Sequence, residues 1–463
     1  FKDVVLINCC FGLGEMVVQG SVSPDEFIVF KPALQNGFHA IIEKKLGVKD
    51  KMMVYGDKGD ERVKIIPTEK GFQHRFCITD STAMQLSGWV VKIEEYYSKI
   101  RNRWTPMDVE WAFDGLSKEL FIVQARPETI HSQINHKKIT EYGISGQSED
   151  RKILLKGIAV GDKIGSGKVN ILYSLDKRVI EGHEFNDGDV LVTDMTDPDW
   201  EPVMKRASAI VTNKGGRTCH AAIVARELGV PAIVGCVNAT QFLQGGDEVT
   251  VSCAEGETGL IYEGILDYIT TEYDLDQLPA VKTPIMLNVA SPSMCFKFSH
   301  LPNKGVGLAR EEFIISNYIQ IHPLALMQHR ELNDIALTKE IEKRIFGYEN
   351  EEDFFTKKLS YGIAKIGAAF YPNPVIVRFS DFKSNEYYNL LGGSHFEPKE
   401  ENPMIGWRGA SRYYSDKYKA AFGLECKAIK IVREEMGLKN VVVMIPFCRT
   451  VEELVKVKEV MKD

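Results

Sequence analysis

The sequence lacks the features that mark membrane proteins, repeat proteins and nucleic-acid-binding proteins. No apolar run approaches the roughly 18 residues of a membrane-spanning helix, and the run from Val441 to Phe447 has the length of a buried strand. Internal repeats and low-complexity segments are absent. The 463 residues carry a formal net charge of -7, which argues against a nucleic-acid partner. We therefore expect a soluble, mildly acidic enzyme without nucleic-acid or membrane partners.

Cysteine pairs at metal-binding or redox spacing are also missing. Nine cysteines occur, but no two form a CxxC pair, so their spacing indicates neither a zinc site nor a redox motif. An odd number of cysteines spread over a long chain is typical of a reducing cytoplasm, which is the expected location. The chain opens on Phe1 without a methionine or a signal peptide, and a strand-like run begins at Val4. We therefore expect a fragment whose N-terminus is missing.

The length and the polar stretches predict a multidomain α/β protein. At about 150 residues each, 463 residues suggest roughly three domains. Two polar stretches of low periodicity are interpreted as linkers, the second of them acidic and partly helical. The predicted order is a first unit at 1–130, a linker at 131–152, a second unit at 153–263, a linker at 264–283 and a third unit at 284–463.

The first unit combines a glycine turn with helix signals. The run GLGE from Gly12 to Glu15 follows an apolar strand, where glycines let the backbone approach a phosphate, although a plain turn explains them equally well. Residues 33–46 are expected to form a helix. Thr79 and Asp80 can cap a longer helix, because the apolar residues from Ala83 to Tyr97 are spaced along one face.

Two alternating segments of this unit predict a hairpin. They are Asp108–Phe113 and Phe121–Arg126, separated by an Asp-Gly turn signal. If Phe113 pairs with Phe121, antiparallel register places Glu110 opposite Gln124 on one face. A carboxylate beside an amide oxygen suits Mg²⁺ on a nucleotide. The same spacing is typical of a solvated hairpin face, so both interpretations stay open.

The second unit contains a glycine loop followed by a helix with a histidine in its first turn. Gly215 and Gly216 end a β-branched run, and Thr218 stands at an N-cap position. The helix is expected to end at Gly229. His220 then lies beside unpaired N–H groups, which favour neutral imidazole and would stabilise a phosphoryl group on it. A histidine that merely caps and packs is the alternative.

The third unit alternates buried strands with helices, which indicates a parallel sheet, most simply part of a (β/α)8 barrel. About five strands are expected, near residues 285, 306, 376, 406 and 442. Arg310 and Arg378 fall at strand C-terminal ends, where such barrels place active sites. Two arginines there suit a phosphate or a carboxylate, whereas structural salt bridges are the alternative.

The run GGRTCHAAIVARELG from Gly215 to Gly229 closely resembles the phosphohistidine signature of the phosphoenolpyruvate-utilising enzymes. The resemblance is collinear over essentially the whole chain. The runs GLGEMVVQG from Gly12, DVEW from Asp108 and QARPET from Gln124 resemble the C-terminal part of the family's ATP-grasp domain. The runs GLAR from Gly307, VRFSDFKSNEY from Val377 and PMIGWRG from Pro403 resemble the N-terminal part of its TIM barrel.

The resemblance implies a role for each matched residue. It implies that His220, on a swivelling β/α phosphohistidine domain, takes a phosphoryl group from ATP and passes it to pyruvate. It implies that Glu110 and Gln124 hold the nucleotide's Mg²⁺ and that Arg126 and Glu15 help to bind ATP. Arg310 and Arg378 would bind pyruvate and phosphoenolpyruvate. Thr218 matches a position of regulatory phosphorylation in the family, which implies a kinase and a phosphorylase as partners. A phosphate on Thr218 would add roughly −1.5 to −2 charge beside His220 and block phosphoryl transfer.

The residues that precede the histidine in the phosphohistidine signature differ between branches of the family. Its Thr-Cys-His sequence favours the branch that uses water rather than orthophosphate as the co-acceptor of the second phosphoryl group. The resemblance also implies that half of each active site lies outside this chain: nucleotide-gripping residues before Phe1, and barrel metal ligands with a proton-donating cysteine after Asp463. An inactive phosphocarrier fragment is therefore a further alternative. In that case the open five-strand barrel leaves a bare hydrophobic edge, which predicts aggregation or a partner that covers it. The whole protein is expected to be a homo-oligomer.

Overall fold

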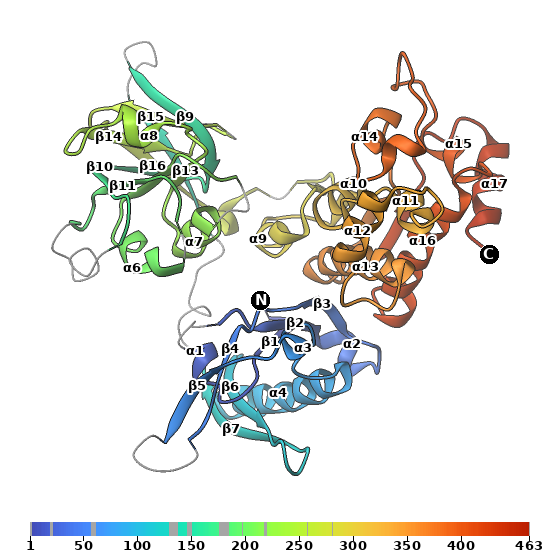
Figure 1. Cartoon of the computed structure of the whole chain (residues 1–463), viewed down its shortest axis with the longest axis horizontal. Coiled ribbons are helices and arrows are strands. Elements are labelled where there is room, and N and C mark those ends of the chain that lie inside the picture. The colour runs from blue at the N-terminus through green and yellow to red at the C-terminus, as the bar shows by residue number, and fades with distance from the viewer. Residues whose placement is uncertain are drawn as a thin grey trace. The chain divides into compact units, whose positions relative to one another are not determined.

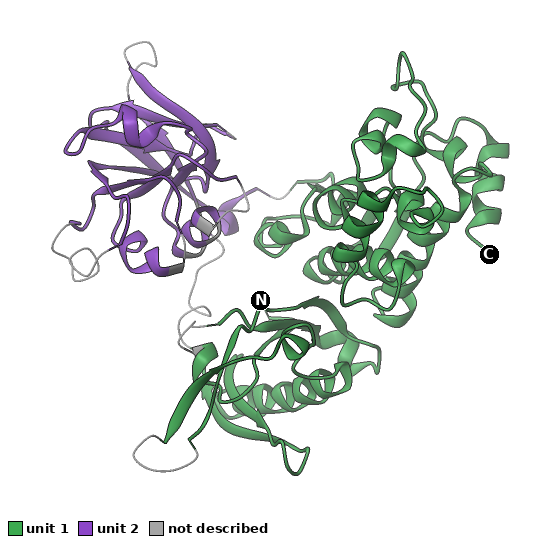
Figure 2. Ribbon diagram, in the orientation of Figure 1, with its two compact units in different colours: residues 1–134, 280–463 green, residues 135–279 purple. Residues whose placement is uncertain are grey.

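The chain forms two compact units in a computed structural model (Figures 1 and 2). One unit contains Phe1–Ile134 together with Ala280–Asp463, and the other is Asn135–Pro279. Because the second unit is inserted into the first, the first is discontinuous in sequence. The structure describes residues 2–18, 22–56, 62–128, 138–145, 151–175, 185–196, 198–216, 220–256, 258–279 and 281–462.

The N-terminal part of the first unit is a small antiparallel sheet with a long helix packed against it (Figure 1). The sheet has the order β1-β2-β3, and two separate hairpins, β4–β5 and β6–β7, accompany it. The helix α4 (Asp80–Ile100) begins as predicted, because the Thr79 hydroxyl accepts a hydrogen bond from the Thr82 N–H. The other elements are β1 (Val4–Cys9), α1 (Glu15–Val18), β2 (Asp25–Phe30), α2 (Lys31–Gln35), β3 (Ile41–Lys45), β4 (Lys51–Tyr55), β5 (Val63–Pro67), α3 (Lys70–Gln73), β6 (Met107–Phe113) and β7 (Leu120–Pro127).

The helix expected at residues 33–46 is wrong. The short helix α2 ends at Gln35, and Gly37 takes a positive φ of 80° that turns the chain. The strand β3 then pairs with β2 and buries Ile41 and Ile42 completely. Burial of two β-branched side chains in a sheet outweighed the weak helical pattern here.

The C-terminal part of the first unit is a parallel sheet in sequential order, β17-β18-β19-β20. Its strands are β17 (Leu287–Val289), β18 (Val306–Arg310), β19 (Val375–Arg378) and β20 (Val441–Met444). The fifth strand expected near residue 406 is wrong, because residues 400–409 form turns. The buried Arg408 side chain is tied to Asp381 in this segment, and Gly409 takes a positive φ of 61°, so the backbone cannot extend.

Helices connect and cover this sheet (Figure 1). The long helix α13, most of whose residues are buried, also packs against β3 of the N-terminal part, where the Lys365 ammonium lies 2.6 Å from the Glu43 carboxylate. Among the described residues, no helix is long and apolar enough to cross a membrane. The helices are α9 (Cys295–Ser299), α10 (Glu311–Ile314), α11 (Pro323–Gln328), α12 (Ile335–Arg344), α13 (Glu351–Ala369), α14 (Ser384–Tyr388), α15 (Ala410–Tyr413), α16 (Lys419–Lys430) and α17 (Val451–Val460).

The second unit is a closed barrel of mixed strands in the order β10-β11-β12-β13-β9-β15-β14. Strands β10 to β13 are parallel to one another, and the remaining pairings are antiparallel. The elements are β9 (Ile153–Val160), β10 (Ile164–Ile171), β11 (Val190–Thr193), α6 (Glu201–Met204), β12 (Ala209–Thr212), α7 (His220–Leu228), β13 (Ala232–Val234), α8 (Ala239–Phe242), β14 (Glu248–Ser252) and β15 (Thr258–Glu263).

The segments that lead into and out of this barrel pair with each other. Strands β8 (Lys138–Ile144) and β16 (Tyr268–Asp274) form a two-stranded antiparallel ribbon that runs from Lys138 opposite Asp274 to Ile144 opposite Tyr268. An ion pair between Lys138 and Glu272 supports it. The stretch after residue 264 is predicted to be partly helical; among its described residues it contains the strand β16 and a single 3₁₀ turn at Leu275–Gln277. Pairing between β8 and β16 stabilises the extended conformation of two polar segments that would not be stable as single strands.

Candidate functional site

His220 is the first residue of helix α7, which follows strand β12 and the glycine loop. Gly215 has a positive φ of 119°, and Gly229 ends the helix at a positive φ of 67°, as predicted for a C-terminal cap. His220 therefore belongs to the first turn of a helix, where the backbone N–H groups have no hydrogen-bond partner within the helix. Thr218 lies outside the described residues, so its expected capping role stays a prediction.

The loop before His220 is anchored by Asn213, a residue that the sequence pattern did not single out. Its side-chain amide donates to Thr240 Oγ1 at 2.7 Å and to Asp194 Oδ1 at 3.2 Å, and its amide oxygen accepts from the Thr240 N–H at 3.1 Å. Lys214 binds the same carboxylate at 2.8 Å, and these two neighbours hold the pKa of Asp194 below its ordinary value. The loop is therefore fixed to the end of strand β11 and to helix α8 before helix α7 begins.

The hairpin β6–β7 places Glu110 opposite Gln124, as predicted. The premise of that prediction is wrong, because Phe113 pairs with Leu120 and Ala112 pairs with Phe121. A β-bulge between Glu110 and Trp111 shifts the register by one residue and restores the predicted pairing. Both side chains are exposed on the same face of the hairpin.

The neighbouring pair on this face is Asp108 opposite Arg126. The Arg126 guanidinium donates to Asp108 Oδ2 at 3.0 and 3.2 Å, and both side chains are more than half exposed. The expected nucleotide arginine is therefore held in place by a carboxylate of its own hairpin. Glu15 is exposed at the first position of helix α1, directly after the glycine turn.

Arg310 and Arg378 are direct neighbours at the carboxyl ends of two parallel strands. They are paired in the register of β18 with β19, as expected for the rim of a parallel sheet. The Arg310 side chain is exposed and lies over the ring of Phe313, with its guanidinium carbon 5.8 Å from the ring centroid. Arg378 is partly buried, at 22% exposure.

Arg378 is held by a network of charged residues on the same rim. Its guanidinium lies 2.5 Å from Glu312 and 3.3 Å from Asp381. Asp381 in turn receives a two-pronged contact from Arg408, at 3.0 and 2.8 Å, and its backbone N–H donates to Glu312. Asp381 and Arg408 lie in two of the family-like sequence runs, but their roles could not be predicted because their contacts span separate loops.

A pair of buried carboxyl groups lies beneath this rim. Glu311 on α10 is fully buried and faces Glu425 on α16, which accepts hydrogen bonds from the Ser380 N–H at 3.1 Å and the Ser380 hydroxyl at 2.6 Å. Burial, and then the charge of Glu425, raise the pKa of Glu311 well above its ordinary value. Burial also raises the pKa of Glu425, to about 7. Ser380 is two residues from Arg378, so this pair supports the arginine rim from below.

The structure thus brings together two sets of predicted residues within the first unit. Glu110 and Gln124 offer a carboxylate and an amide oxygen on one exposed face, a donor set that fits Mg²⁺ because that ion prefers oxygen ligands. Arg310 and Arg378 offer two cations at one sheet edge. His220 belongs to the second unit.

Three family models match the chain in collinear order. Residues 1–144 match the model described as "Pyruvate phosphate dikinase, AMP/ATP-binding domain". Residues 185–256 match "PEP-utilising enzyme, mobile domain", and residues 271–463 match "PEP-utilising enzyme, PEP-binding domain". The matched order is therefore ATP-binding, mobile and PEP-binding.

Curated relatives match over nearly the whole of this chain. A phosphoenolpyruvate synthase from Aquifex aeolicus is 55% identical over 100% of this chain and 59% of its own length. Those from Synechocystis and Escherichia coli are 53% and 48% identical, over 98% and 99% of this chain and 55% and 56% of their own lengths. The chain therefore spans somewhat more than half the length of the curated relatives it matches.

Proposed function

We propose, because the chain belongs to the family of phosphoenolpyruvate-utilising enzymes, that the protein acts as a phosphoenolpyruvate synthase. The proposed reaction converts ATP, pyruvate and water to AMP, phosphoenolpyruvate and phosphate, through a phosphoryl group carried on His220. The observation that carries the proposal is the position of His220 at the start of a helix behind an anchored glycine loop. The 48–55% identity to phosphoenolpyruvate synthases supports the choice of reaction.

The histidine would divide one difficult transfer into separate nucleophilic steps. First the imidazole attacks the β-phosphorus of ATP, the bond from that phosphorus to the α-phosphate oxygen breaks, and AMP leaves. Water then removes the terminal phosphoryl group as phosphate, and finally the enolate oxygen of pyruvate attacks the remaining phosphohistidine, whose P–N bond breaks. Helix N–H groups at His220 would stabilise the phosphoryl oxygens without reorganisation. The second unit would be the carrier between the two substrates, as a separate compact unit permits.

The ATP side of the reaction is assigned to the hairpin β6–β7 and the glycine turn. Glu110 and Gln124 would hold Mg²⁺, which when bound neutralises charge on the nucleotide's phosphates. Arg126, oriented by Asp108, would contact ATP, and Glu15 would assist from the start of α1. In this proposal residues 1–130 are the C-terminal part of an ATP-grasp domain.

The pyruvate side is assigned to the arginine rim. Arg310 and Arg378 would bind the carboxylate of pyruvate and the phosphate of phosphoenolpyruvate, since two adjacent guanidinium groups suit such anions. Residues 284–463 would be the first part of a TIM barrel, consistent with four parallel strands in sequential order. Residues 153–263 would be the swivelling phosphohistidine domain.

Regulation is proposed at Thr218, two residues before the carrier histidine. A phosphate on this threonine would place negative charge beside the incoming phosphoryl group and repel it. A kinase and a phosphorylase acting on Thr218 would then switch the relay off and on.

The relay is tested in the whole protein by replacing His220 with alanine. The expected result is complete loss of phosphoenolpyruvate formation and of label transfer from radiolabelled ATP to the protein. His300→Ala is the matched control, because His300 caps the C-terminal end of helix α9 instead of a helix start, and it should retain both. Substantial activity of the His220 variant would refute the relay.

Two alternatives give different products. A pyruvate, phosphate dikinase would form AMP with pyrophosphate in place of AMP with phosphate, so product analysis of the whole protein separates it from a synthase. An inactive phosphocarrier made of this chain alone would take label from ATP yet form no phosphoenolpyruvate. Labelling of the isolated 463-residue chain tests that case.

A further inference from the structure

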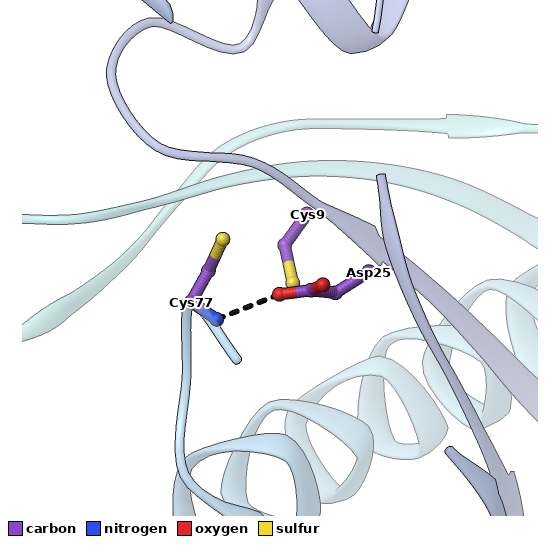
Figure 3. A group of neighbouring side chains, drawn as sticks. All are labelled: Cys9, Asp25 and Cys77. Carbon is purple, nitrogen blue, oxygen red and sulfur yellow. Dashed lines mark hydrogen bonds between the residues drawn. The ribbon is translucent and has the colours of Figure 1, made fainter. Parts of the chain in front are cut away.

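Two cysteines and an aspartate meet in the N-terminal part of the first unit, although their spacing in the sequence indicates no metal site (Figure 3). Cys9 ends strand β1 and is paired in register with Asp25, the first residue of β2. Cys77 comes from the segment between helices α3 and α4. Their potential ligand atoms, two sulfurs and a carboxylate oxygen, all lie within 4.8 Å of one another.

We infer that Cys9, Asp25 and Cys77 form a binding site for one Zn²⁺ ion. Zinc bound by thiolate sulfur at about 2.3 Å and carboxylate oxygen at about 2.0–2.2 Å has ligand atoms less than about 4 Å apart, so a small inward movement closes the site. Three protein ligands leave a fourth tetrahedral position for water. Two thiolates select a soft cation over Mg²⁺ or Ca²⁺, so this site is chemically distinct from the proposed nucleotide site.

The carboxylate of Asp25 retains an acceptor position for the ion. Its Oδ1 accepts from the Gly47 N–H at 2.8 Å and from the Lys49 ammonium, while its Oδ2 accepts from the Cys77 N–H at 2.7 Å. Since each carboxylate oxygen can accept about two hydrogen bonds, Oδ2 keeps one lone pair. Figure 3 shows the Cys77 N–H contact beside the Cys9 sulfur. The same contacts fix the side-chain orientation of Asp25 before an ion arrives.

The charge balance of the site permits a divalent ion in a buried place. Asp25 and Lys49 are both almost fully buried and neutralise each other, at 0% and 1% exposure. A Zn²⁺ ion that displaces the two thiol protons adds two positive charges and removes two, so the net charge is unchanged. An isolated buried charge would be costly, whereas this exchange creates none. Cys77 is only partly buried, which gives the ion a path from solvent.

A bound ion would add a further link between strand β1, strand β2 and the segment before α4, which already contact one another through the β1–β2 pairing and the packing of Phe76 on Phe27. Cys9 stands three residues before Gly12, so the site would hold the end of β1, and with it the glycine turn, against the segment that enters α4. Zinc should therefore stabilise the first unit, in proportion to the ion's affinity and concentration.

The test uses the full 463-residue chain, stripped of metal under reducing conditions and titrated with Co²⁺ and then Zn²⁺. We expect one Co²⁺ to bind per chain with release of two protons and with a sulfur-to-cobalt charge-transfer band. Zn²⁺ should then displace the Co²⁺ and abolish the band without further proton release. Cys9→Ser and Cys77→Ser should each weaken binding at least about 100-fold and reduce the band, since even residues that only orient ligands cost 10–100-fold. Cys448→Ser, at an exposed cysteine, is the control that should bind normally.

Three results would overturn the inference. The first is the absence of uptake at micromolar Zn²⁺. The second is equal binding by the two test variants and the wild-type chain. The third is formation of a Cys9–Cys77 disulfide in air by a chain that takes up no metal. Both serine variants preserve Asp25, whose own replacement would unfold the sheet by leaving Lys49 buried without its partner.

Discussion

Replacing Glu311 with glutamine should stabilise the first unit near neutral pH and flatten the dependence of its stability on pH. The buried Glu311–Glu425 pair keeps a proton at pH values where the same carboxyl groups in the unfolded chain have lost theirs. Unfolding therefore releases that proton, and the free energy of unfolding falls as the pH rises. Glutamine preserves the shape of the side chain and has no proton to lose.

The magnitude follows from proton linkage. One proton held in the native state alone lowers the free energy of unfolding by about 1.4 kcal/mol for each pH unit. The effect begins above the ordinary glutamate pKa of 4.5 and continues through neutral pH, because the pKa of Glu311 is raised well above that value. Below pH 4.5 both states are protonated, so the pair contributes no pH dependence. Between about pH 5 and 7, the variant should gain on the order of 2–3 kcal/mol relative to the wild-type chain.

The assay is urea denaturation followed by tryptophan fluorescence at several pH values between about 5 and 7, the window in which linkage operates. Glu331→Gln is the control, because Glu331 is exposed and should leave the slope of stability against pH unchanged. Equal slopes for the wild-type chain and the Glu311 variant would refute the assigned proton. A variant that is less stable at neutral pH would refute it as well.

Two further substitutions test the contacts around the site. Asn213→Ala should destabilise the second unit by about 1–3 kcal/mol, because it leaves the buried polar groups that bind Asn213 without a partner. It should also slow phosphoryl transfer to His220. The urea midpoint measures the first effect and the labelling rate measures the second. Arg408→Lys should lower the thermal midpoint of unfolding, because lysine cannot reproduce the bidentate contact with Asp381. The control Arg449→Lys, at an exposed arginine, should leave the midpoint unchanged. Equal midpoints for the Arg408 variant and the wild-type chain would show that this contact contributes nothing to stability.

Signals confined to one segment predicted much of the fold. The start of α4 at Thr79 and the end of α7 at Gly229 depend on capping residues that act within a single turn, so they could be located from the sequence. The positions of Arg310 and Arg378 followed from the ends of two apolar runs. These predictions succeeded because each depended on few neighbours.

The remaining features depend on residues that are distant in sequence. The apolar run near residue 406 resembled a strand, but the Arg408 contact with Asp381 holds it in turns. The hairpin bulge was not visible in the alternating pattern, although the predicted pairing of Glu110 with Gln124 depends on it. The Glu311–Glu425 pair joins elements more than a hundred residues apart, and no spacing rule describes such a contact.

Because strands β8 and β16 pair with each other, the second unit could be deleted or exchanged as one contiguous segment. Its entry and exit strands run side by side from Lys138 opposite Asp274 onward, so the chain leaves the unit next to the point where it entered. Paired residues on neighbouring strands lie about 5 Å apart, a gap that a two-residue turn can close. The genetic segment between these positions could therefore be exchanged for a short turn, or for the corresponding segment of a relative, without lengthening or shortening the path through the first unit.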